Sequence, residues 1–280
     1  MAGSVLVNGE AHVGVAADDR GLCYGDGLFE TVALRRGNPL LWGAHLERLS
    51  AGAALLGLPS PDAAVWSADL SRLLPPEPAE RLVLKLMLTR GSGGRGYAPP
   101  PNPAPTRILQ LFEWPDWPDS NARTGIAAHV CATRLGCNPT LAGLKHLNRL
   151  EQVLAAREVG EAGVDEGLML DGEGRLVEGV RTNLFMVVDG ELLTPTLRRC
   201  GVRGVMRDCV LEGARELRVP FRETDCDPAW LARATEIFVC NSLIGLWPVR
   251  SIAGLRTQLA APGDLTRQLQ AWLGAKNLTA

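Results

Sequence analysis

Apolar residues alternate with polar ones in the first 42 residues and again between residues 81 and 112. A period of two is expected of strands that bury one face, and the dipeptides Asn8-Gly9 and Gly37-Asn38 supply hairpin turns. Between these segments, apolar residues recur at intervals of three and four, as in amphipathic helices. We therefore expect a sheet with two helices, with strands over 4–7, 28–35, 81–89 and 106–112 and helices over 44–56 and 62–74.

The second half of the chain also mixes strand and helix periods. The turns Asp171-Gly172 and Asp189-Gly190 predict an antiparallel meander with strands over 167–170, 176–179 and 184–188. The other expected strands cover 126–133, 219–223, 235–240 and 246–252, and the helices cover 147–161, 205–217 and the C-terminal run with Leu265, Leu269, Trp272 and Leu273.

The segment 113–121, EWPDWPDSN, carries no period and is rich in proline and aspartate. Such a segment is typical of a linker between domains. The pattern thus predicts an α+β protein with a small α+β domain over 1–112 and a larger domain over 122–280. A length of 280 residues is enough for two domains of this kind.

The composition argues against several classes of function. The 29 lysines and arginines are balanced by 31 aspartates and glutamates, so no basic surplus favours nucleic acid or an anionic membrane. No apolar run approaches the roughly 18–20 residues that span a bilayer, and the first 18 residues lack the features of a signal peptide. We expect a cytoplasmic protein. Seven cysteines without C-x-x-C spacing and four scattered histidines predict reduced thiols and no metal site.

A glycine-rich segment follows the strand 81–89. Residues 91–96 satisfy the pattern G-x-G-x-x-G, but the run of prolines after Tyr97 cannot open the helix that a dinucleotide-binding turn requires. The alternatives are a substrate loop that displays Arg95 and Tyr97, or an ordinary surface loop.

Only three lysines occur in the chain, Lys85, Lys145 and Lys276. Lys145 lies in the run Leu141-Ala-Gly-Leu-Lys-His-Leu, and apolar surroundings favour the neutral amine that forms a Schiff base with a carbonyl or with pyridoxal phosphate. The same pattern also fits a lysine that extends to solvent from a helix start. Lys85 lies opposite the leucine face of its strand and is a weaker candidate.

A pyridoxal phosphate site also needs an anion pocket and a carboxylate for the pyridine nitrogen. The helix that opens at Val205 points the backbone N–H groups of Val205 and Met206 outward, where a phosphate is stabilised. Glu178 ends a strand before Gly179, which puts one carboxylate at a sheet edge. Taken alone, these two patterns are more typical of an ordinary glycine-started helix and of a solvated glutamate.

Taken together, the motifs resemble those of the fold-type IV pyridoxal phosphate enzymes, which include branched-chain and D-amino-acid aminotransferases and aminodeoxychorismate lyase. The resemblance covers nearly the whole chain, and two segments, 90–97 and 141–152, are similar to the lyase branch in particular. The motifs that carry it are Tyr24-Gly-Asp-Gly-Leu-Phe-Glu, Ala44-His-Leu-Glu-Arg-Leu, Val177-Glu178 with Thr182-Asn183-Leu-Phe, Gly204-Val-Met-Arg and Cys240-Asn-Ser-Leu.

This resemblance implies a role for each matching residue. It implies that Lys145 binds the cofactor covalently and that Glu178 pairs with the pyridine nitrogen. Thr31 would place a hydroxyl near the reacting carbon. The residues implied to bind the cofactor are Arg48, Lys145, Glu178, Thr182, Val205, Met206, Asn241 and Ser242, and those implied to meet a substrate carboxylate are Arg95 and Tyr97.

The resemblance also implies a fold and a reaction. The expected fold is a small α/β sandwich domain beside a larger β-barrel-like domain with helices. The expected reaction converts 4-amino-4-deoxychorismate into 4-aminobenzoate and pyruvate, a step of folate synthesis, in a homodimer supplied by an aminodeoxychorismate synthase. An aminotransferase of branched-chain or D-amino acids and a cofactor-free binding protein are the alternatives.

Overall fold

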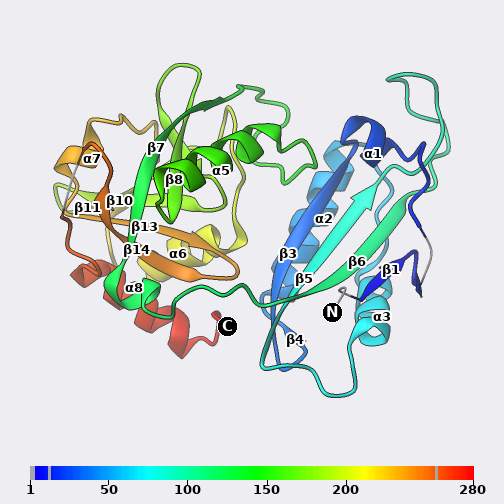
Figure 1. Ribbon diagram of the computed structural model, residues 1–280, viewed down its shortest axis with the longest axis horizontal. Coiled ribbons are helices and arrows are strands. Elements are labelled where there is room, and N and C mark those ends of the chain that lie inside the picture. The colour runs from blue at the N-terminus through cyan, green and yellow to red at the C-terminus, as the bar shows by residue number, and fades with distance from the viewer. Residues whose placement is uncertain (1–3, 12–13, 256–257) are drawn as a thin grey trace. The chain divides into compact units, whose positions relative to one another are not determined.

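A computed structural model describes residues 4–11, 14–255 and 258–280 (Figure 1). The chain forms two compact units. Unit 1 comprises Met1–Pro115 and Lys145–Asn148 with Ala280, and unit 2 comprises Asp116–Leu144 and Arg149–Thr279. The division falls inside the segment expected to be a linker. The short segment Lys145–Asn148 belongs to unit 1, which the sequence pattern does not predict.

Unit 1 is built on an antiparallel sheet with the strand order β2-β1-β6-β5-β3-β4. The long strands β3 and β5 pair without a break from Gly27↔Thr89 to Arg35↔Arg81. The strands are β1 (Val5–Val7), β2 (Glu10–Ala11), β3 (Gly27–Arg35), β4 (Asn38–Pro39), β5 (Arg81–Thr89) and β6 (Thr106–Glu113).

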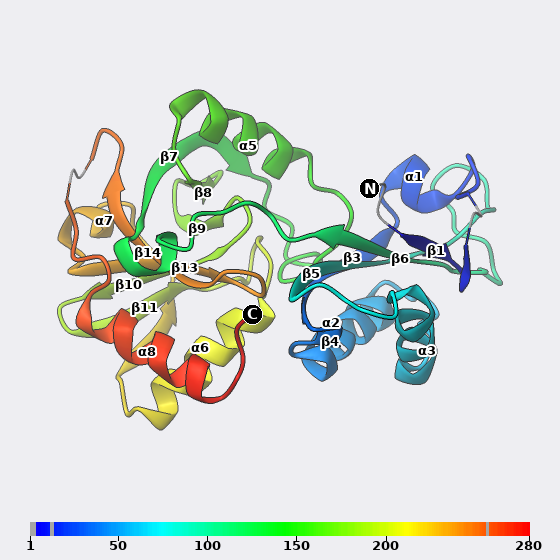
Figure 2. The ribbon, with the colours of Figure 1, turned by 60° about the horizontal axis from the view of Figure 1, so that its bottom comes forward.

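Two helices, α2 (Trp42–Leu55) and α3 (Ala63–Leu73), cover one face of this sheet (Figure 2). The buried core there includes Leu84 of β5, Leu49 of α2 and Trp66 of α3. Each such side chain stabilises the fold by about 1.5–3 kcal/mol. A third helix, α1 (Arg20–Tyr24), is too short for a periodic signal and begins where Asp19 accepts a hydrogen bond from Gly21 N.

Unit 2 contains a mixed sheet with the order β12-β11-β10-β13-β14-β7-β8-β9, in which β11 with β12, β14 with β7 and β7 with β8 are parallel pairs. The strands are β7 (Ile126–Leu135), β8 (Glu166–Asp171), β9 (Leu176–Gly179), β10 (Asn183–Val188), β11 (Glu191–Pro195), β12 (Phe221–Thr224), β13 (Glu236–Asn241) and β14 (Gly245–Ile252).

The predicted antiparallel meander is wrong in one respect. β8 and β9 do pair antiparallel, but β10 pairs with β11 and β13 instead of β9. The sheet curls until Leu176 of the edge strand β9 donates to the carbonyl of Cys226, which follows the opposite edge strand β12. A turn signal reports only that the chain reverses, so it does not identify the next partner in a curled sheet. This curled sheet agrees with the β-barrel-like larger domain that the resemblance implies, and the two units together are α+β.

Helices α6 (Val205–Glu216) and α8 (Asp264–Ala275) pack against each other beside the sheet, and α5 (Leu150–Ala162) packs on β7 and β8 (Figure 2). Two short helices, α4 (Asn121–Thr124) and α7 (Trp230–Arg233), complete the described elements of unit 2. Among the described residues, no helix has both the length and the apolar character needed to cross a membrane.

Candidate active site

Lys145 lies in an extended segment along the edge of β3 and not at the start of a helix. Its carbonyl accepts a hydrogen bond from Phe29 N at 3.0 Å, and Leu147 N donates to the carbonyl of Gly27 at 3.0 Å. Because of this pairing, α5 begins at Leu150, three residues after the expected start. The side chain of Lys145 is half-buried. Its position is therefore fixed by a strand of unit 1, although the flanking residues belong to unit 2.

Two lysine amines lie over the ring of Phe29. The Nζ of Lys145 lies 4.3 Å from the ring centroid, and the Nζ of Lys85 lies 5.5 Å from it. Thr31 is two residues farther along β3 and pairs with Lys85 in register, so it shares the face of Phe29. One sheet face thus brings together the predicted nucleophile Lys145, the predicted hydroxyl of Thr31 and the alternative lysine.

Arg48 is part of a buried ionic cluster between α2 and β3. Its Nε donates to Oε1 of Glu30 at 2.8 Å and its Nη2 donates to Oε2, while Nδ1 of His45 lies 2.7 Å from Oε2. Burial would raise the pKa of Glu30, but the hydrogen bonds from His45 and Arg48 outweigh it and lower the pKa to about 2. The side chain of Arg48 keeps 16% exposure, whereas that of Glu30 keeps 1%.

The positive charge of Lys145 affects the pKa of His45 in this cluster. Burial lowers the pKa of His45, and the positive charges of Arg48 and Lys145 lower it further against the opposing effect of Glu30. His45 is therefore neutral at pH 7, and Arg48 supplies the positive charge of the cluster. In the sequence, Glu30 stands out only as the last residue of the motif that begins at Tyr24, and His45 only as part of the motif that begins at Ala44. Their pairing depends on how the helix packs.

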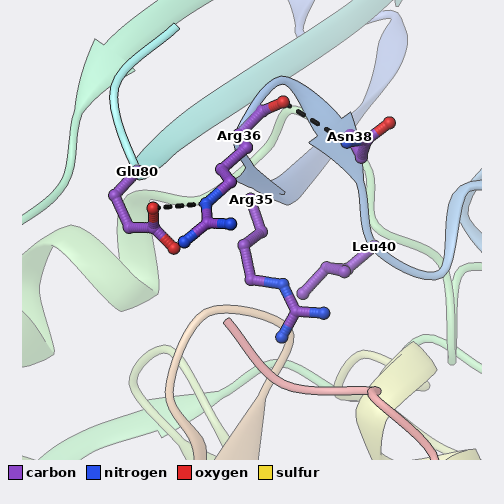
Figure 3. Close-up of a pocket in the computed structure, with 5 residues that line it drawn as sticks. All are labelled: Arg35, Arg36, Asn38, Leu40 and Glu80. Carbon is purple, nitrogen blue, oxygen red and sulfur yellow. Dashed lines mark hydrogen bonds and ion pairs between the residues drawn. The ribbon is translucent and has the colours of Figure 1, made fainter.

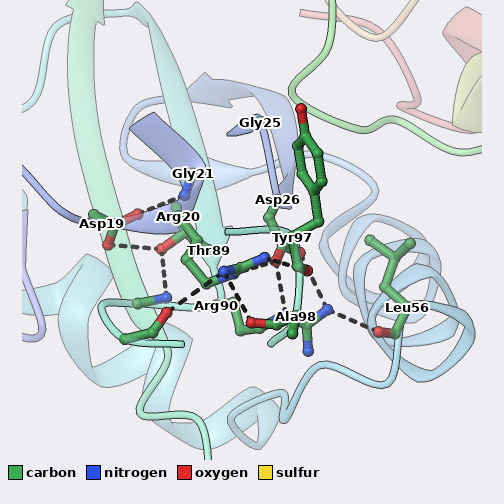
Figure 4. A network of polar contacts seen from close by, with 12 residues as sticks. Asp19, Arg20, Gly21, Gly25, Asp26, Leu56, Thr89, Arg90, Tyr97 and Ala98 are labelled. Carbon is green, nitrogen blue, oxygen red and sulfur yellow. Dashed lines mark hydrogen bonds and ion pairs between the residues drawn. The ribbon is translucent and has the colours of Figure 1, made fainter. Parts of the chain in front are cut away.

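Arg20 binds the backbone of the loop that carries Tyr97 (Figure 4). Arg95 belongs to the same loop. The guanidinium of Arg20 donates to the carbonyls of Gly96 and Tyr97, each at 3.0 Å. The side chain of Tyr97 is 88% exposed, and its ring lies 5.6 Å from that of Tyr24. Arg95 is exposed as well. Both predicted substrate residues thus project from an ordered loop of unit 1.

Asp26 joins Arg20 to a second buried arginine (Figure 4). Its Oδ2 accepts from Arg20 Nε at 2.9 Å and from Arg90 Nε at 2.8 Å, and Arg90 also donates to the carbonyls of Leu56 and Gly57. Burial opposes ionisation of Asp26, but the two guanidinium groups lower its pKa. No pattern in the sequence marks Arg20, Asp26 or Arg90 as site residues, although Asp26 lies inside the motif that begins at Tyr24 and Arg90 begins the segment 90–97.

Glu178 of β9 is 4% exposed and points at the turn that precedes α6. Its Oε2 accepts from Val202 N at 2.7 Å, and its Oε1 is 3.5 Å from Nε2 of Gln152. Gly201 adopts φ +87°, and a Cβ there would lie 3.2 Å from Oε2 of Glu178 and 2.8 Å from a side-chain carbon of Val177. A glycine is thus required where the turn approaches the carboxylate.

Thr182 donates its hydroxyl hydrogen to Oε2 of Glu166 at 3.0 Å. The other oxygen of Glu166 accepts from Gly167 N and Val180 N. Burial raises the pKa of Glu166 despite these bonds and the charge of Arg181. The described hydrogen bond of the predicted cofactor residue Thr182 is therefore to a buried carboxyl group. Nothing in the pattern distinguishes Glu166 from other glutamates.

Helix α6 begins without a side-chain cap. Its N-cap residue is Gly204, and the first turn carries the buried residues Val205 and Met206. A Cβ on Gly204 would lie 2.1 Å from Oδ1 of Asn183, so any other residue there would force the side chain of Asn183 to move. The helix thus presents N–H groups that no side chain caps, and such groups stabilise an anion.

Asn241 shapes the loop that carries Ser242. Its Oδ1 accepts from Leu243 N at 2.9 Å and from Ile244 N at 3.0 Å, and its Nδ2 donates to the carbonyl of Arg181 at 3.1 Å. The described side-chain bonds of Asn241 therefore hold the backbone of the loop, and Ser242 is half-buried within it.

A hollow of about 510 Å³ in unit 1 lies elsewhere (Figure 3). It contains none of the predicted site residues. An ion pair between Arg36 and Glu80, at 2.6 Å, crosses it. Since both side chains are more than half exposed, the hollow is a solvated surface feature. Its lining residues are Arg35, Arg36, Asn38, Leu40 and Glu80.

Comparisons with known proteins agree on one family. The family described as Amino-transferase class IV matches residues 27–252. Aminodeoxychorismate lyase of Vibrio harveyi is 37% identical over 266 residues, which are 94% of this chain and 97% of that protein.

Solved structures agree with the sequence relatives. 4-Amino-4-deoxychorismate lyase from Pseudomonas aeruginosa is similar with a TM-score of 0.90 and 47% identity, over 97% of this chain and 98% of that one. Branched-chain amino acid aminotransferase from Escherichia coli is similar with a TM-score of 0.84 and 26% identity, over 98% and 94%.

These findings confirm the expected enzyme class and the expected cofactor, pyridoxal 5'-phosphate, which the resemblance ties to this family. A match over most of the length, together with a 37% identical relative aligned almost end to end, establishes the family. The chain belongs to the class IV aminotransferase family.

Proposed function

We propose that the protein converts 4-amino-4-deoxychorismate into 4-aminobenzoate and pyruvate. The observation that carries the proposal is the 47% identity to a solved 4-amino-4-deoxychorismate lyase over 97% of the chain, against 26% for an aminotransferase of similar fold. The lyase-like segments 90–97 and 141–152 support the same choice. The atoms balance without a second substrate, because the enolpyruvyl group leaves as pyruvate while the ring becomes aromatic.

The residues present suit pyridoxal phosphate. The uncapped start of α6 offers the N–H groups of Val205 and Met206 to a phosphate, and Arg48 offers a partly exposed guanidinium. Asn241 fixes the loop from which Ser242 would bind the same phosphate. Thr182 would contact the ring from its place beside Glu166.

When bound, pyridoxal phosphate supplies a carbonyl carbon that captures an amine and a ring that accepts an electron pair. The amine of Lys145 holds the cofactor and then takes the proton from the substrate carbon that carries the amino group. Glu178 holds a proton at the pyridine nitrogen, a role that its amide partner Val202 prepares by orienting the carboxylate. Thr31 offers its hydroxyl on the sheet face that carries the amine of Lys145.

The substrate carboxylate is assigned to Arg95 and Tyr97. Both side chains are exposed, and Arg20 holds the backbone beneath them through the carbonyls of Gly96 and Tyr97. A guanidinium and a phenol on one short loop bind a carboxylate by charge and by hydrogen bonding. An ordered loop reduces the entropy that binding costs.

The reaction is tested with substrate made in place from chorismate by an aminodeoxychorismate synthase. We expect 4-aminobenzoate and pyruvate in equal amounts with no 2-oxo acid added. Lys145→Ala should abolish both products, whereas Lys85→Ala, which removes the other amine on the ring of Phe29, should keep most of the activity. Borohydride reduction should attach the cofactor to the peptide that contains Lys145 and not to that of Lys85.

The aminotransferase alternative gives a different result. Turnover of D-alanine or a branched-chain amino acid that depends on 2-oxoglutarate, with no 4-aminobenzoate formed, would overturn the lyase and leave the cofactor assignment intact. A homodimer, coupling to the synthase and a cytoplasmic location remain part of the proposal. Sedimentation of the purified protein tests the first of these.

A further inference from the structure

Two cysteines that the proposed reaction does not use lie together in unit 2. The Sγ atoms of Cys137 and Cys200 and a carboxylate oxygen of Asp171 are all within 4.8 Å of one another. Cys137 is exposed and Cys200 is buried. The sequence places these cysteines 63 positions apart, so only the fold reveals the pair.

The backbone holds the two thiols in place. Asn138 N donates to the carbonyl of Arg199 at 2.8 Å, so the residues that follow Cys137 run beside those that precede Cys200. Farther along, Gly143 N donates to the carbonyl of Gly201 at 2.9 Å. Two such bonds hold the segments that carry the pair side by side, and the two sulfurs, which lie within 4.8 Å of each other, must approach to the roughly 2 Å of a disulfide bond.

The neighbours of Asp171 favour a disulfide over a metal site. Its Oδ2 already accepts from Arg175 Nε at 2.9 Å, and Arg199 lies 3.9 Å from the same oxygen. Its Oδ1 accepts two backbone N–H groups, from Glu173 and Arg175. A divalent cation would have to displace these donors and would be repelled by two guanidinium groups.

We propose that Cys137 and Cys200 form a reversible intramolecular disulfide when a peroxide oxidises the protein. Cys137 reduces one molecule of hydrogen peroxide to water and becomes a sulfenic acid, and the sulfur of Cys200 then attacks it and releases a second water. Each thiol loses its hydrogen, so two thiols and one peroxide give one disulfide and two waters. Cys137 is exposed and Cys200 is buried, so Cys137 is the thiol that meets peroxide. Burial and the neighbouring Cys137 and Asp171 also raise the pKa of Cys200, which keeps it a thiol.

The bond would join two segments that matter to the proposed reaction, and this consequence rests on the proposed function. Cys200 is two residues before Val202, whose amide binds Glu178, and Cys137 opens the segment that leads to Lys145. The disulfide itself depends only on the two thiols. Its formation can therefore be measured whether or not the protein is a lyase.

The experiment treats the cofactor-loaded protein with hydrogen peroxide, denatures it, alkylates free thiols and identifies peptides by mass spectrometry. We expect a peptide pair joined through Cys137 and Cys200, two fewer alkylated thiols per chain, and full reversal by dithiothreitol. Cys200→Ser should trap the sulfenic acid of Cys137 as a dimedone adduct. Cys23→Ser, which removes the other exposed cysteine, should leave the joined peptides unchanged.

Two results would overturn the proposal. One is a sulfinic or sulfonic acid at Cys137 with Cys200 still free for alkylation, because the thiols then oxidise separately. The other is one zinc ion per chain that is lost in Cys137→Ser and shields both thiols from peroxide, because the cluster would then be a metal site.

Discussion

Two buried glutamates, one in each unit, have opposite acid–base behaviour. Glu30 of β3 is 1% exposed and Glu166 of β8 is 2% exposed, so burial alone would treat them alike. The pKa of Glu30 is nevertheless lowered to about 2, whereas that of Glu166 is raised. The difference lies in their partners. Glu30 contacts Arg48 and His45 directly, while Glu166 accepts only N–H and hydroxyl hydrogens at short range, and Arg181 stays 3.7 Å away.

This contrast separates two tasks. In unit 1, the ion pair keeps a guanidinium oriented at the edge of the core, which is useful for binding an anion. In unit 2, hydrogen bonds from Gly167, Val180 and Thr182 fix a turn without needing a charge. Both glutamates are buried, but only Glu30, which pairs with a cation, must be ionised for its role. Glu166 can hold its turn as a neutral carboxyl group.

The largest expected effect comes from breaking the cluster of unit 1. Glu30→Ala leaves Arg48 and His45 without their shared acceptor, and loss of one partner of a buried pair costs about 3–5 kcal/mol. We expect this loss in the free energy of unfolding, measured by urea denaturation. Glu80→Ala, at the exposed pair with Arg36, is the matched control and should change stability by less than about 1 kcal/mol. Equal losses would mean that the cluster is not structural.

The second prediction concerns acid. The ordinary pKa of Glu30 is 4.5 and the folded value is about 2, so the unfolded chain binds the proton first and stability is lost as the pH falls between these values. At about 1.4 kcal/mol per pH unit, the whole loss over these roughly 2.5 units is about 3.5 kcal/mol. Glu30→Gln cannot titrate at this site. The stability difference between wild type and variant should stay constant above pH 4.5 and shrink below it.

His45 should also lower the stability of the fold in acid, beginning at a higher pH than Glu30. Its pKa is lowered by burial, so the unfolded state takes up a proton as the pH falls through the ordinary value of 6.5 while the folded state does not. This loss should persist in Glu30→Gln and disappear in His45→Gln. A stability profile that is flat from pH 7 to pH 5 in the wild type would contradict it.

The third prediction tests whether the guanidinium held by Glu30 binds the cofactor. Arg48→Ala removes charged hydrogen bonds to a phosphate, each contributing about 1.5–3 kcal/mol, so cofactor affinity should fall roughly ten- to a hundred-fold. Affinity is measured by absorbance during dialysis. Arg36→Ala, whose side chain is 76% exposed, should retain the cofactor as the wild type does. Arg207 would be a poor control, because it is buried and pairs with Glu223.

Local periods in the sequence were enough to predict most elements, but not the contacts that assemble the clusters. The strand 81–89 was predicted to the residue, because its leucines alternate over nine positions. By contrast, α5 begins at Leu150 because residues near Lys145 pair with β3, a partner more than a hundred positions away. The same limit hid the bond between Arg20 and the carbonyl of Tyr97. Periodicity reports burial and says nothing about which buried groups meet.

Residue type and motif were enough to select the candidate site residues, but they did not predict which groups surround each of them. Lys145 and Thr31 emerge on one sheet face, as alternation along β3 requires. Thr182 was expected at a cofactor-contact position, and its hydroxyl binds Glu166, which no motif marks. Whether a glutamate is ionised depends on neighbours brought by folding, so the sequence could not separate Glu30 from Glu166.

The smallest expected effect concerns Glu166. Since its pKa is raised by burial, the folded state keeps the proton while the unfolded state releases it above the ordinary value of 4.5. Stability contributed by this group is therefore highest at low pH and falls as the pH rises through that window, the reverse of Glu30. Glu166→Gln keeps the acceptor for Gly167 N and Val180 N and leaves an amide beside Thr182, so the cost should be about 1 kcal/mol near pH 5.

As the pH rises further, the stability difference between wild type and Glu166→Gln should shrink. The wild type loses stability, because its unfolded state releases the proton that the folded state keeps, whereas the amide of the variant does not titrate. The measurement is the difference in urea unfolding free energy between wild type and Glu166→Gln from pH 5 to pH 8. Glu166→Ala provides the contrast, since it abandons both N–H groups and should cost more at every pH. A cost of Glu166→Gln that grows with pH would show that the carboxylate form stabilises unit 2, and the two buried glutamates would then be alike.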